Sequence, residues 1–287
     1  MGETLGLIAG RGVFPLEVAR CARRRGQRVV CVAMREMADA HLEELVDELH
    51  WIHPGEVGAG VAAFRAAGVE EAVMAGKVAK GSLIADPEAL RLDGQAESLL
   101  AELPDFEDDS VLGKAADFLA ALGIRLLPQH ALCPELLAGE GVLTKAAPTA
   151  AQRADLDFGF PIARAIGGLD IGQTVVVKDR AVLAVEAIEG TDAAIRRGGA
   201  LAAGACVVKV AKPDQDSRFD VPAIGPDTVR VLAEAGIAAL GFEAGATLVL
   251  EREELVREAD AHGIAVAGLS GPADGIATAG LSGPGGT

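Results

Sequence analysis

The stretch LGLIAGRGVFPLEVARCARRRGQRVVCVAM, residues 5–34, predicts how the chain begins to fold. A short apolar run ends at Gly10, and residues 11–26 follow with apolar side chains at helical spacing. A second apolar run covers residues 27–34, so the order is strand, glycine turn, helix and strand. Later segments continue this alternation of helices and strands, which favours a parallel sheet covered by helices: 62–68, 70–76, 108–123 and 123–128.

The second half of the chain has a different pattern. Glycine and proline interrupt the periodicity over residues 136–152, which we interpret as a linker. The segment TVVVKDRAVLAVEAIEG, residues 174–190, is apolar on both sides of a charged turn and predicts two strands of a hairpin. Residues 226–243 are predicted to be helical, with Pro226 in the first turn.

These patterns predict an α/β fold in which a Rossmann-like parallel-sheet domain is linked to a second, mixed α/β domain. Beyond them, AGLSGP occurs at residues 267–272 and again at 279–284 among Gly, Ala, Ser and Pro, which favours a flexible, low-complexity tail over a docking segment. The predicted boundaries are 1–135 for the first domain, 136–152 for the linker, 153–267 for the second domain and 268–287 for the tail.

Composition excludes several classes of function. The chain has 287 residues, enough for about two domains, and half of them are hydrophobic. Lys and Arg number 26 against 42 Asp and Glu, and a net charge of −16 disfavours nucleic acid and an anionic membrane surface as partners. The start of the chain lacks a basic, apolar signal segment, and the four cysteines show no C-x-x-C spacing. We therefore expect a soluble, reduced, cytoplasmic protein without a zinc site or a disulfide framework.

The glycine turn is the first candidate site. Gly10 and Gly12 stand between a strand and a helix, where backbone N–H groups and the positive end of the helix can bind an anion. A dinucleotide fingerprint would place a third glycine at Pro15, and it would want an acid where Arg35 follows the second strand. A phosphate or nucleotide-sugar contact, NAD(P) binding and a purely structural turn all remain open. Lys77, after the strand ending in VMAG, is either a cation for a substrate phosphate or a solvated lysine.

A second candidate site is the charged stretch KVAKPDQDSRFDVPAIG, residues 209–225. Aspartates at its centre are able to supply oxygen ligands to Mg²⁺, while the cations are able to neutralise a pyrophosphate. Another acidic cluster lies in AVEAIEGTD, which ends at Asp192. The alternative for both is a solvated surface loop. The charged residues of the longer stretch are Lys209, Lys212, Asp214, Asp216, Arg218 and Asp220, and the acidic cluster comprises Glu186, Glu189, Thr191 and Asp192.

Covalent serine chemistry and P-loop hydrolysis are disfavoured, because the chain has neither G-x-S-x-G nor G-x-x-x-x-G-K-[ST]. In contrast, four segments taken together resemble the LpxI family, the UDP-2,3-diacylglucosamine pyrophosphatases of lipid A biosynthesis. They are LGLIAGRGVFP, LDIGQTVVV, AVEAIEGTDAAIRR and KVAKPDQDSRFDVPAIGPDTV, and the resemblance spans residues 4 to 267.

The resemblance implies a Mg²⁺-dependent hydrolysis of UDP-2,3-diacylglucosamine to UMP and 2,3-diacylglucosamine 1-phosphate (lipid X). It also implies a lipid-linked nucleotide-sugar substrate held between two domains, and peripheral contact with the cytosolic face of the inner membrane of Gram-negative bacteria. It gives no oligomeric state.

The resemblance, carried over residue by residue, and the chemistry of the charged residues described above together assign roles to the candidate residues. Asp220, Asp216, Asp227 and Arg218 are the expected catalytic residues, and Asp214, Asp216 and Asp220 the expected Mg²⁺ ligands. Asp227 also opens a predicted helix, where it would serve equally as a cap. The expected substrate-binding residues are Gly10, Gly12, Lys77, Asp170, Gln173, Glu189, Thr191, Asp192, Lys209, Lys212 and Gln215.

Two rival functions stay open. A nucleotide-dependent oxidoreductase would bind nicotinamide at the glycine turn and would tolerate loss of Asp220. A non-catalytic carrier or regulator would hold a nucleotide sugar or lipid without turnover. The density of aspartates and cations over residues 209–220 favours hydrolysis over both, since neither rival needs it.

Overall fold

The computed structural model describes residues 3–77, 91–101, 108–213 and 215–271, and these form two compact units. Unit 1 comprises the chain up to Leu136 together with Asp216–Val221. Unit 2 comprises Leu137–Gln215 and the chain from Pro222 onward. The charged stretch at 209–225 is therefore divided, because its middle segment packs in unit 1 while its two ends belong to unit 2.

Unit 1 is built on a five-stranded parallel sheet in the order β3-β2-β1-β4-β5. The chain goes outward from β1 to β2 and β3, then returns to β4 on the other side of β1. This is the doubly wound arrangement that the alternation of strands and helices predicted. The strands are β1 (Thr4–Ala9), β2 (Arg28–Met34), β3 (Glu48–Ile52), β4 (Glu71–Ala75) and β5 (Arg125–Leu126).

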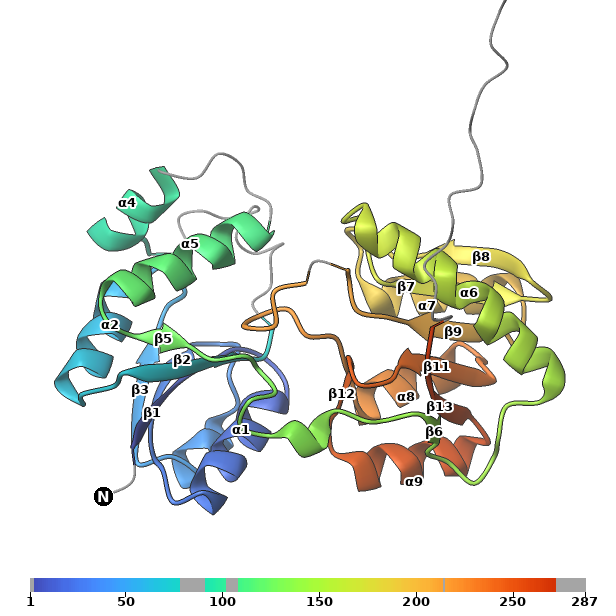
Figure 1. Ribbon diagram of the computed structural model, residues 1–287, viewed down its shortest axis with the longest axis horizontal. Coiled ribbons are helices and arrows are strands. Elements are labelled where there is room, and N and C mark those ends of the chain that lie inside the picture. Colours follow the sequence, from blue (N-terminus) through green and yellow to red (C-terminus); the bar gives the residue numbers. More distant parts are fainter. Residues whose placement is uncertain (1–2, 78–90, 102–107, 214, 272–287) are drawn as a thin grey trace, which may run out of the picture. The chain divides into compact units, whose positions relative to one another are not determined.

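Helices cover both faces of this sheet (Figure 1). The helix α1 buries Leu16, Val18 and neighbouring apolar side chains on one face. On the other face, Phe64 of α2 and Leu119 of α5 pack with Val30 and Val32 of β2. The helical elements are α1 (Phe14–Arg24), η1 (Ala40–Glu44), α2 (Val57–Ala66), α4 (Gly94–Ala101), α5 (Asp108–Ala121) and η3 (Pro134–Leu136).

Unit 2 is built on a mixed six-stranded sheet in the order β6-β13-β11-β9-β7-β8. The long helix α6 packs on one face, and α7, α8 and α9 pack on the other. The strands are β6 (Gly141–Val142), β7 (Thr174–Lys178), β8 (Ala181–Val185), β9 (Cys206–Lys209), β11 (Ala239–Glu243) and β13 (Ala265–Leu269), with β10 (Ala223–Ile224) and β12 (Leu248–Val249) in a separate pair. The helices are α6 (Ala150–Gly168), α7 (Thr191–Leu201), α8 (Pro226–Glu234) and α9 (Arg252–His262).

The hairpin predicted over 174–190 is confirmed as the antiparallel pair β7 and β8. Its turn residues Asp179 and Arg180 have φ of 50° and 57°. Their backbone N–H groups donate to the two carboxylate oxygens of Asp155, at 3.1 and 2.7 Å. Asp155 lies on α6 and is buried, so the hairpin turn satisfies a carboxylate that would otherwise be costly to bury.

The helix predicted over 226–243 is wrong in its second half. Helix α8 ends at Glu234, and Gly236 turns the chain with φ of 66°. Residues Ala239–Glu243 then form β11, which pairs with β9 on one side and β13 on the other. Because β11 is central and covered on both faces, its apolar residues form a continuous run that periodicity does not distinguish from a helix.

None of the helices within the described ranges is long and apolar enough to span a bilayer. The predicted tail lies outside the described residues from position 272 onward. Residues 268 and 269, at its predicted start, are part of β13.

Candidate functional site

The glycine turn and Lys77 are brought together at the end of the unit 1 sheet. The backbone N–H of Gly10 donates to Ala75 O at 2.8 Å, and Arg11 and Lys77 exchange backbone hydrogen bonds of 2.8 and 2.9 Å. These contacts join the carboxyl ends of β1 and β4. The order of the strands reverses between β1 and β4, and in doubly wound sheets this switch point is where ligands bind.

Glycine is required here by close approach and by backbone conformation. A Cβ at Gly10 would lie 2.7 Å from Lys77 O. Gly76 has φ of 87°, and a Cβ there would lie 2.7 Å from Arg11 O. Gly12 has φ of 100° with open space around it, so its constraint is conformational. The turn therefore places glycine backbone directly before the start of α1, as in anion-binding turns.

The segment 216–221 carries an ion pair in unit 1. Arg218 Nη2 lies 2.6 Å from Asp216 Oδ2, and Arg218 Nε lies 3.0 Å from both carboxylate oxygens. Hydrogen bonding to Arg218 holds the pKa of Asp216 below its ordinary value. The same bond raises the pKa of Arg218, and the charge of Asp117 adds to this effect. Asp216 is therefore ionised and engaged with an arginine at neutral pH.

A buried amide that the sequence analysis missed holds this segment. Gln129 follows β5 and is 4% exposed. Its backbone N–H donates to Ser217 O at 2.7 Å, and its side-chain Oε1 accepts from Val221 N at 2.9 Å. Phe219, between these two contacts, packs against the core of unit 1. No pattern in the sequence near Gln129 indicates that its partners lie almost ninety positions later. The one available signal was a polar glutamine in an otherwise apolar stretch.

Unit 2 carries a buried chain of a cation, a hydroxyl and a carboxylate. Lys209 Nζ donates to Thr191 Oγ1 at 3.3 Å, and this hydroxyl donates to Glu186 Oε1 at 2.7 Å. Lys209 is 5% exposed and Glu186 is 8% exposed. They stand at the carboxyl ends of β9 and β8, while Thr191 is the first residue of α7. This arrangement keeps an ammonium group buried, which costs free energy and is unusual without a function.

The neighbouring predicted residues line the same end of the unit 2 sheet. Lys212 Nζ lies 2.6 Å from Asp170 Oδ1, and its backbone N–H donates to Gln215 Oε1 at 3.0 Å. The backbone N–H of Gln173 donates to Glu186 Oε2 at 3.4 Å. Within the described residues, Gln173 Oε1 and Gln215 Nε2 are buried and find no hydrogen-bond partner. Buried amide atoms without partners cost free energy, and a bound water or ligand would satisfy them.

The loop that follows β9 is anchored by a pair that the sequence analysis also missed. Glu243, the last residue of β11, lies 2.9 Å from Arg164 Nη1 and accepts from the backbone N–H of Ala211 at 2.8 Å. Arg164 lies on α6. The sequence gives no signal for this pair, because its members are far apart and only the sheet order brings β11 beside β9.

Three predicted acids lie apart from these contacts, and one is outside the described residues. Glu189 pairs with Arg197 of α7, and hydrogen bonds from its own backbone and from Arg197 hold the pKa of Glu189 below its ordinary value. Asp192 is exposed in the first turn of α7. Asp227 is exposed on α8 and pairs with Arg230. Asp214 falls outside the described residues.

The described residues contain no group of three or more His, Cys, Asp or Glu arranged to hold a metal ion. Of the predicted ligands, Asp216 has both carboxylate oxygens engaged by Arg218. Asp220 lies in the same turn, and its backbone N–H donates to Asp216 O at 3.1 Å.

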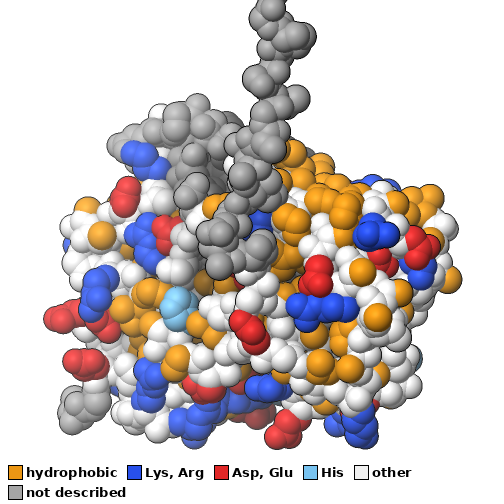
Figure 2. All heavy atoms as spheres, turned by 45° about the vertical axis from the view of Figure 1, so that its right-hand side comes forward, with side chains coloured by type: hydrophobic (Ala, Val, Ile, Leu, Met, Phe, Trp, Pro, Cys, Tyr) orange, Lys and Arg blue, Asp and Glu red, His pale blue; other side chains and the backbone are white. Residues whose placement is uncertain are grey.

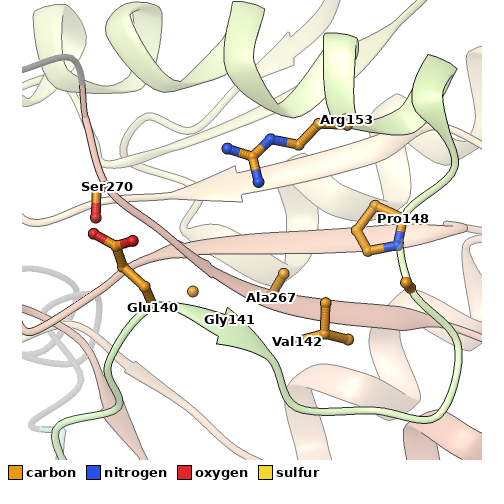
Figure 3. Close-up of a pocket in the computed structure, with 9 residues that line it drawn as sticks. Glu140, Gly141, Val142, Pro148, Arg153, Ala267 and Ser270 are labelled. Atoms are coloured by element: carbon orange, nitrogen blue, oxygen red, sulfur yellow. The ribbon is translucent and has the colours of Figure 1, made fainter.

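A surface pocket of about 590 Å³ lies elsewhere in unit 2, at the sheet edge formed by β6 and β13. Figure 3 shows Arg153 and Glu140 at its polar margin, with Val142 and Pro148 along its wall. None of the predicted site residues lines it. We therefore place the candidate site at the carboxyl ends of the strands and not in this pocket.

Exposed apolar side chains occur close to the unit 2 cluster. Leu169, Ile171 and Ile188 are 70%, 46% and 90% exposed, and we refer to them as the apolar rim. The loop of the first two packs against the loop of the third, because a Cβ at Gly172 would lie 2.3 Å from Glu186 O. Figure 2 shows hydrophobic side chains gathered over part of one face, while acidic and basic side chains are interspersed elsewhere on it.

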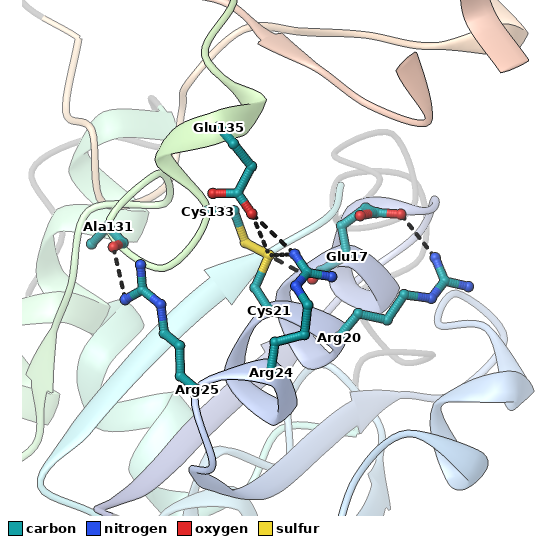
Figure 4. Close-up of a disulfide and its surroundings, with 8 residues drawn as sticks. All are labelled: Glu17, Arg20, Cys21, Arg24, Arg25, Ala131, Cys133 and Glu135. Atoms are coloured by element: carbon teal, nitrogen blue, oxygen red, sulfur yellow. Dashed lines mark hydrogen bonds and ion pairs between the residues drawn. A yellow bond between two sulfur atoms is a disulfide. The ribbon is translucent and has the colours of Figure 1, made fainter. Parts of the chain in front are cut away.

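A disulfide between Cys21 and Cys133 contradicts the expectation of unpaired cysteines. It joins α1 to the segment before η3, and the Cα atoms are 6.0 Å apart. Arg24 Nη2 lies 3.0 Å from both Cys21 Sγ and Glu135 Oε1 (Figure 4). No local sequence pattern indicates this disulfide, because its two cysteines are 112 residues apart. Cys31 and Cys206 are free and buried, and burial raises the pKa of both thiols to about 12.

Taken together, the two units define a two-domain α/β protein with charged side chains gathered at the carboxyl ends of parallel strands. Residues 4–136 match the model of the LpxI N-terminal domain, and residues 139–267 match that of the LpxI C-terminal domain. The chain is 35% identical over 277 residues to UDP-2,3-diacylglucosamine pyrophosphatase LpxI of Caulobacter vibrioides. The match covers 92% of this chain and 97% of the relative. The chain belongs to the LpxI family.

Two of the solved structures that match this chain are distant likenesses. The biotin carboxylase domain of a thermophilic 2-oxoglutarate carboxylase bound to ADP is 15% identical, with a TM-score of 0.26, over 61% of this chain and 34% of that one. Biotin carboxylase from Campylobacter jejuni is 14% identical, with a TM-score of 0.27, over 68% and 41%. At these scores neither carries an argument about this chain.

Proposed function

We propose that this chain hydrolyses the pyrophosphate bond of UDP-2,3-diacylglucosamine, giving UMP and 2,3-diacylglucosamine 1-phosphate in lipid A biosynthesis. The relative from Caulobacter vibrioides bears the name of this activity, and the match extends over nearly the full length of both chains. The glycine turn at the switch point of unit 1 and the cations of the charged stretch are features that suit the binding of a nucleotide diphosphate.

The observation that carries this proposal is the buried chain from Lys209 through Thr191 to Glu186. An ammonium group kept at 5% exposure costs free energy, and its position at the carboxyl end of β9 suits an anionic ligand. In the proposed reaction Lys209, with Lys212, offsets the negative charge that develops on the pyrophosphate.

We further propose that residues of both units act on one substrate. The N–H groups of the glycine turn, with Lys77, bind phosphate oxygens, while Gln173 and Thr191 contribute from unit 2. Asp220 orients the attacking water and takes its proton. The water oxygen bonds to one phosphorus, the bond from that phosphorus to the bridging oxygen breaks, and the bridging oxygen keeps the electron pair.

Magnesium assistance is part of the proposal. Proteins commonly hold Mg²⁺ with one or two carboxylates together with substrate phosphates, so a preformed three-residue site is unnecessary. Among the described acids we assign this role to Asp220, which lies in the same turn as Asp216 and donates its backbone N–H to Asp216 O. Bound there, the ion would neutralise charge on the pyrophosphate.

The apolar rim suits the acyl part of this substrate. Three large aliphatic side chains at 46% to 90% exposure on adjacent loops are costly in water, and hydrocarbon contact would offset that cost. We propose that they contact the acyl chains, with the substrate taken from the cytosolic face of the inner membrane.

UMP release from UDP-2,3-diacylglucosamine tests the proposed function. The assay compares the purified chain in Mg²⁺ with the same chain in EDTA, and it includes Asp220→Ala beside Asp157→Ala. Asp157 is an exposed acid on α6 that pairs with Arg153, so its loss serves as a matched control. We expect release that needs the metal, disappears in Asp220→Ala and survives in Asp157→Ala. Substrate binding without release would refute hydrolysis and favour a carrier.

A further inference from the structure

Gln129 joins two distant parts of unit 1 through every polar group of its side chain. Its Nε2 donates to Met74 O at 2.9 Å, near the carboxyl end of β4. Its Oε1 accepts from Val221 N at 2.9 Å. The backbone N–H of the same residue donates to Ser217 O at 2.7 Å. A primary amide is needed for this arrangement, because the two side-chain bonds require one donor and one acceptor.

Gln129 makes two hydrogen bonds to the segment 216–221, and residues that take part in the proposed reaction lie between them. Ser217 O and Val221 N are the anchor points, and Arg218, Phe219 and Asp220 lie between them. Arg218 in turn holds Asp216 just before the first anchor. The loop from 216 to 221 is therefore fixed at both ends by one residue, and Phe219 fixes its middle on the core.

The third hydrogen bond, from Gln129 Nε2 to Met74 O, connects the loop to β4, the strand whose end contacts the glycine turn. Met74 immediately precedes Ala75, whose carbonyl accepts from the backbone N–H of Gly10. Gln129 thus connects the acid-bearing loop to the end of β4, one residue before the point where β4 meets the glycine turn. Because Gln129 is 4% exposed, water does not replace these bonds when they are lost.

We propose that Gln129 is a positioning residue, which fixes the loop of Asp216, Arg218 and Asp220 relative to the glycine turn within unit 1. This assignment rests on the proposed hydrolysis for its kinetic consequence. The geometric part, that Gln129 holds the loop, stands without it. Gln129 itself contacts backbone only and takes no part in bond making.

The decisive variant is Gln129→Glu, which keeps the shape and the acceptor for Val221 N–H but loses the donor to Met74 O when ionised. Burial at this position raises the pKa of the introduced carboxyl, and its protonated form has an O–H donor, so a mildly acidic pH restores the missing bond. We expect kcat for UMP release to fall about 10- to 100-fold at pH 8, with recovery toward the wild-type value near pH 5.5. KM is expected to change little.

Gln95→Glu is the matched control, because Gln95 is an exposed glutamine on α4. Other titratable groups of the joined segments are Lys77, His130, Asp216, Arg218 and Asp220, and all are present in both proteins. The ratio of variant to wild-type activity across pH therefore isolates the introduced carboxyl. A variant as active as the wild type at pH 8, or one whose loss is equal at every pH, would overturn the assignment.

Amide hydrogen exchange tests the geometric part without turnover and in the unaltered chain. The N–H of Val221 is expected to exchange at least tenfold more slowly than exposed loop amides of the wild type, and Gln129→Ala is expected to remove that protection. Rapid exchange of Val221 in the wild type would overturn the proposal even if the variants fail to fold. Slow exchange in a wild type that releases no UMP would instead refute the hydrolysis and leave the loop anchor standing.

Discussion

Lys209→Met tests what the buried ammonium group of Lys209 contributes to stability and to the proposed reaction. The substitution keeps the length and apolar stem of the side chain and removes the ammonium that donates to Thr191. Glu186 then stays buried at 8% exposure with the Thr191 hydroxyl and the Gln173 N–H as its donors, but without the cation. Removing one member of a buried charged set commonly destabilises a protein by several kcal/mol.

The hydroxyl between Lys209 and Glu186 moderates this effect, and we expect a loss of about 2 to 3 kcal/mol in the free energy of unfolding. That corresponds to a fall in Tm of about 6 to 9 °C for a domain of the size of unit 2. UMP release is expected to fall about 100-fold, as when a group that stabilises transition-state charge is removed. Lys145→Met, at an exposed lysine of the same unit, should change stability by less than about 0.5 kcal/mol.

The double variant Lys209→Met with Glu186→Gln completes this experiment. The amide keeps an acceptor for the Thr191 hydroxyl and removes the uncompensated charge, so stability should return to within about 1 kcal/mol of the wild type. Activity should not return, because the cation is still missing. Differential scanning calorimetry and UMP release measure the two quantities. A single variant with unchanged Tm, or a double variant that recovers activity, would refute the reasoning.

Three further outcomes follow from the same structure. Thiol titration of the unfolded, unreduced chain should find two free thiols among the four cysteines, and four free thiols would contradict the disulfide. Reduction of the disulfide between Cys21 and Cys133 should lower the free energy of unfolding by up to about 4 to 5 kcal/mol. The pKa of Asp216 is lowered in the fold, so its ion pair contributes stability above pH 3.8, and this stability is lost as the pH falls through the lowered pKa. Asp216→Asn should therefore reduce Tm at pH 7 and much less at pH 3. An equal reduction of Tm at both pH values would contradict this prediction. Ile188→Ser should raise KM about tenfold for a long-chain substrate and leave it unchanged for a short-chain one, while equal KM changes would remove the apolar rim from acyl binding.

The features predicted from sequence were those that depend on neighbours along the chain. The turn from β1 into α1 shows in a glycine between an apolar run and a helical pattern, and the hairpin of β7 and β8 shows in Lys178-Asp179-Arg180 between apolar runs. The strand β11 was misassigned, because a strand covered on both faces has no alternation and its sequence follows directly on a true helix.

The candidate site was only partly predictable, because tertiary contacts build it. Lys209, Thr191 and Glu186 were chosen for their chemistry, and the chain order of the sheet then brings them together. No local pattern could show that the residues from 216 to 221 pack in unit 1, since this depends on Gln129 and on Phe219 reaching a core made by residues far earlier. The disulfide was hidden for the same reason.

The most direct measurement of the central claim is a ³¹P NMR spectrum of UDP-2,3-diacylglucosamine incubated with the purified chain and Mg²⁺. The account predicts that both pyrophosphate resonances disappear together and that two phosphomonoester resonances replace them, those of UMP and 2,3-diacylglucosamine 1-phosphate. Pyrophosphate resonances that persist while the substrate is bound by the folded chain would contradict it.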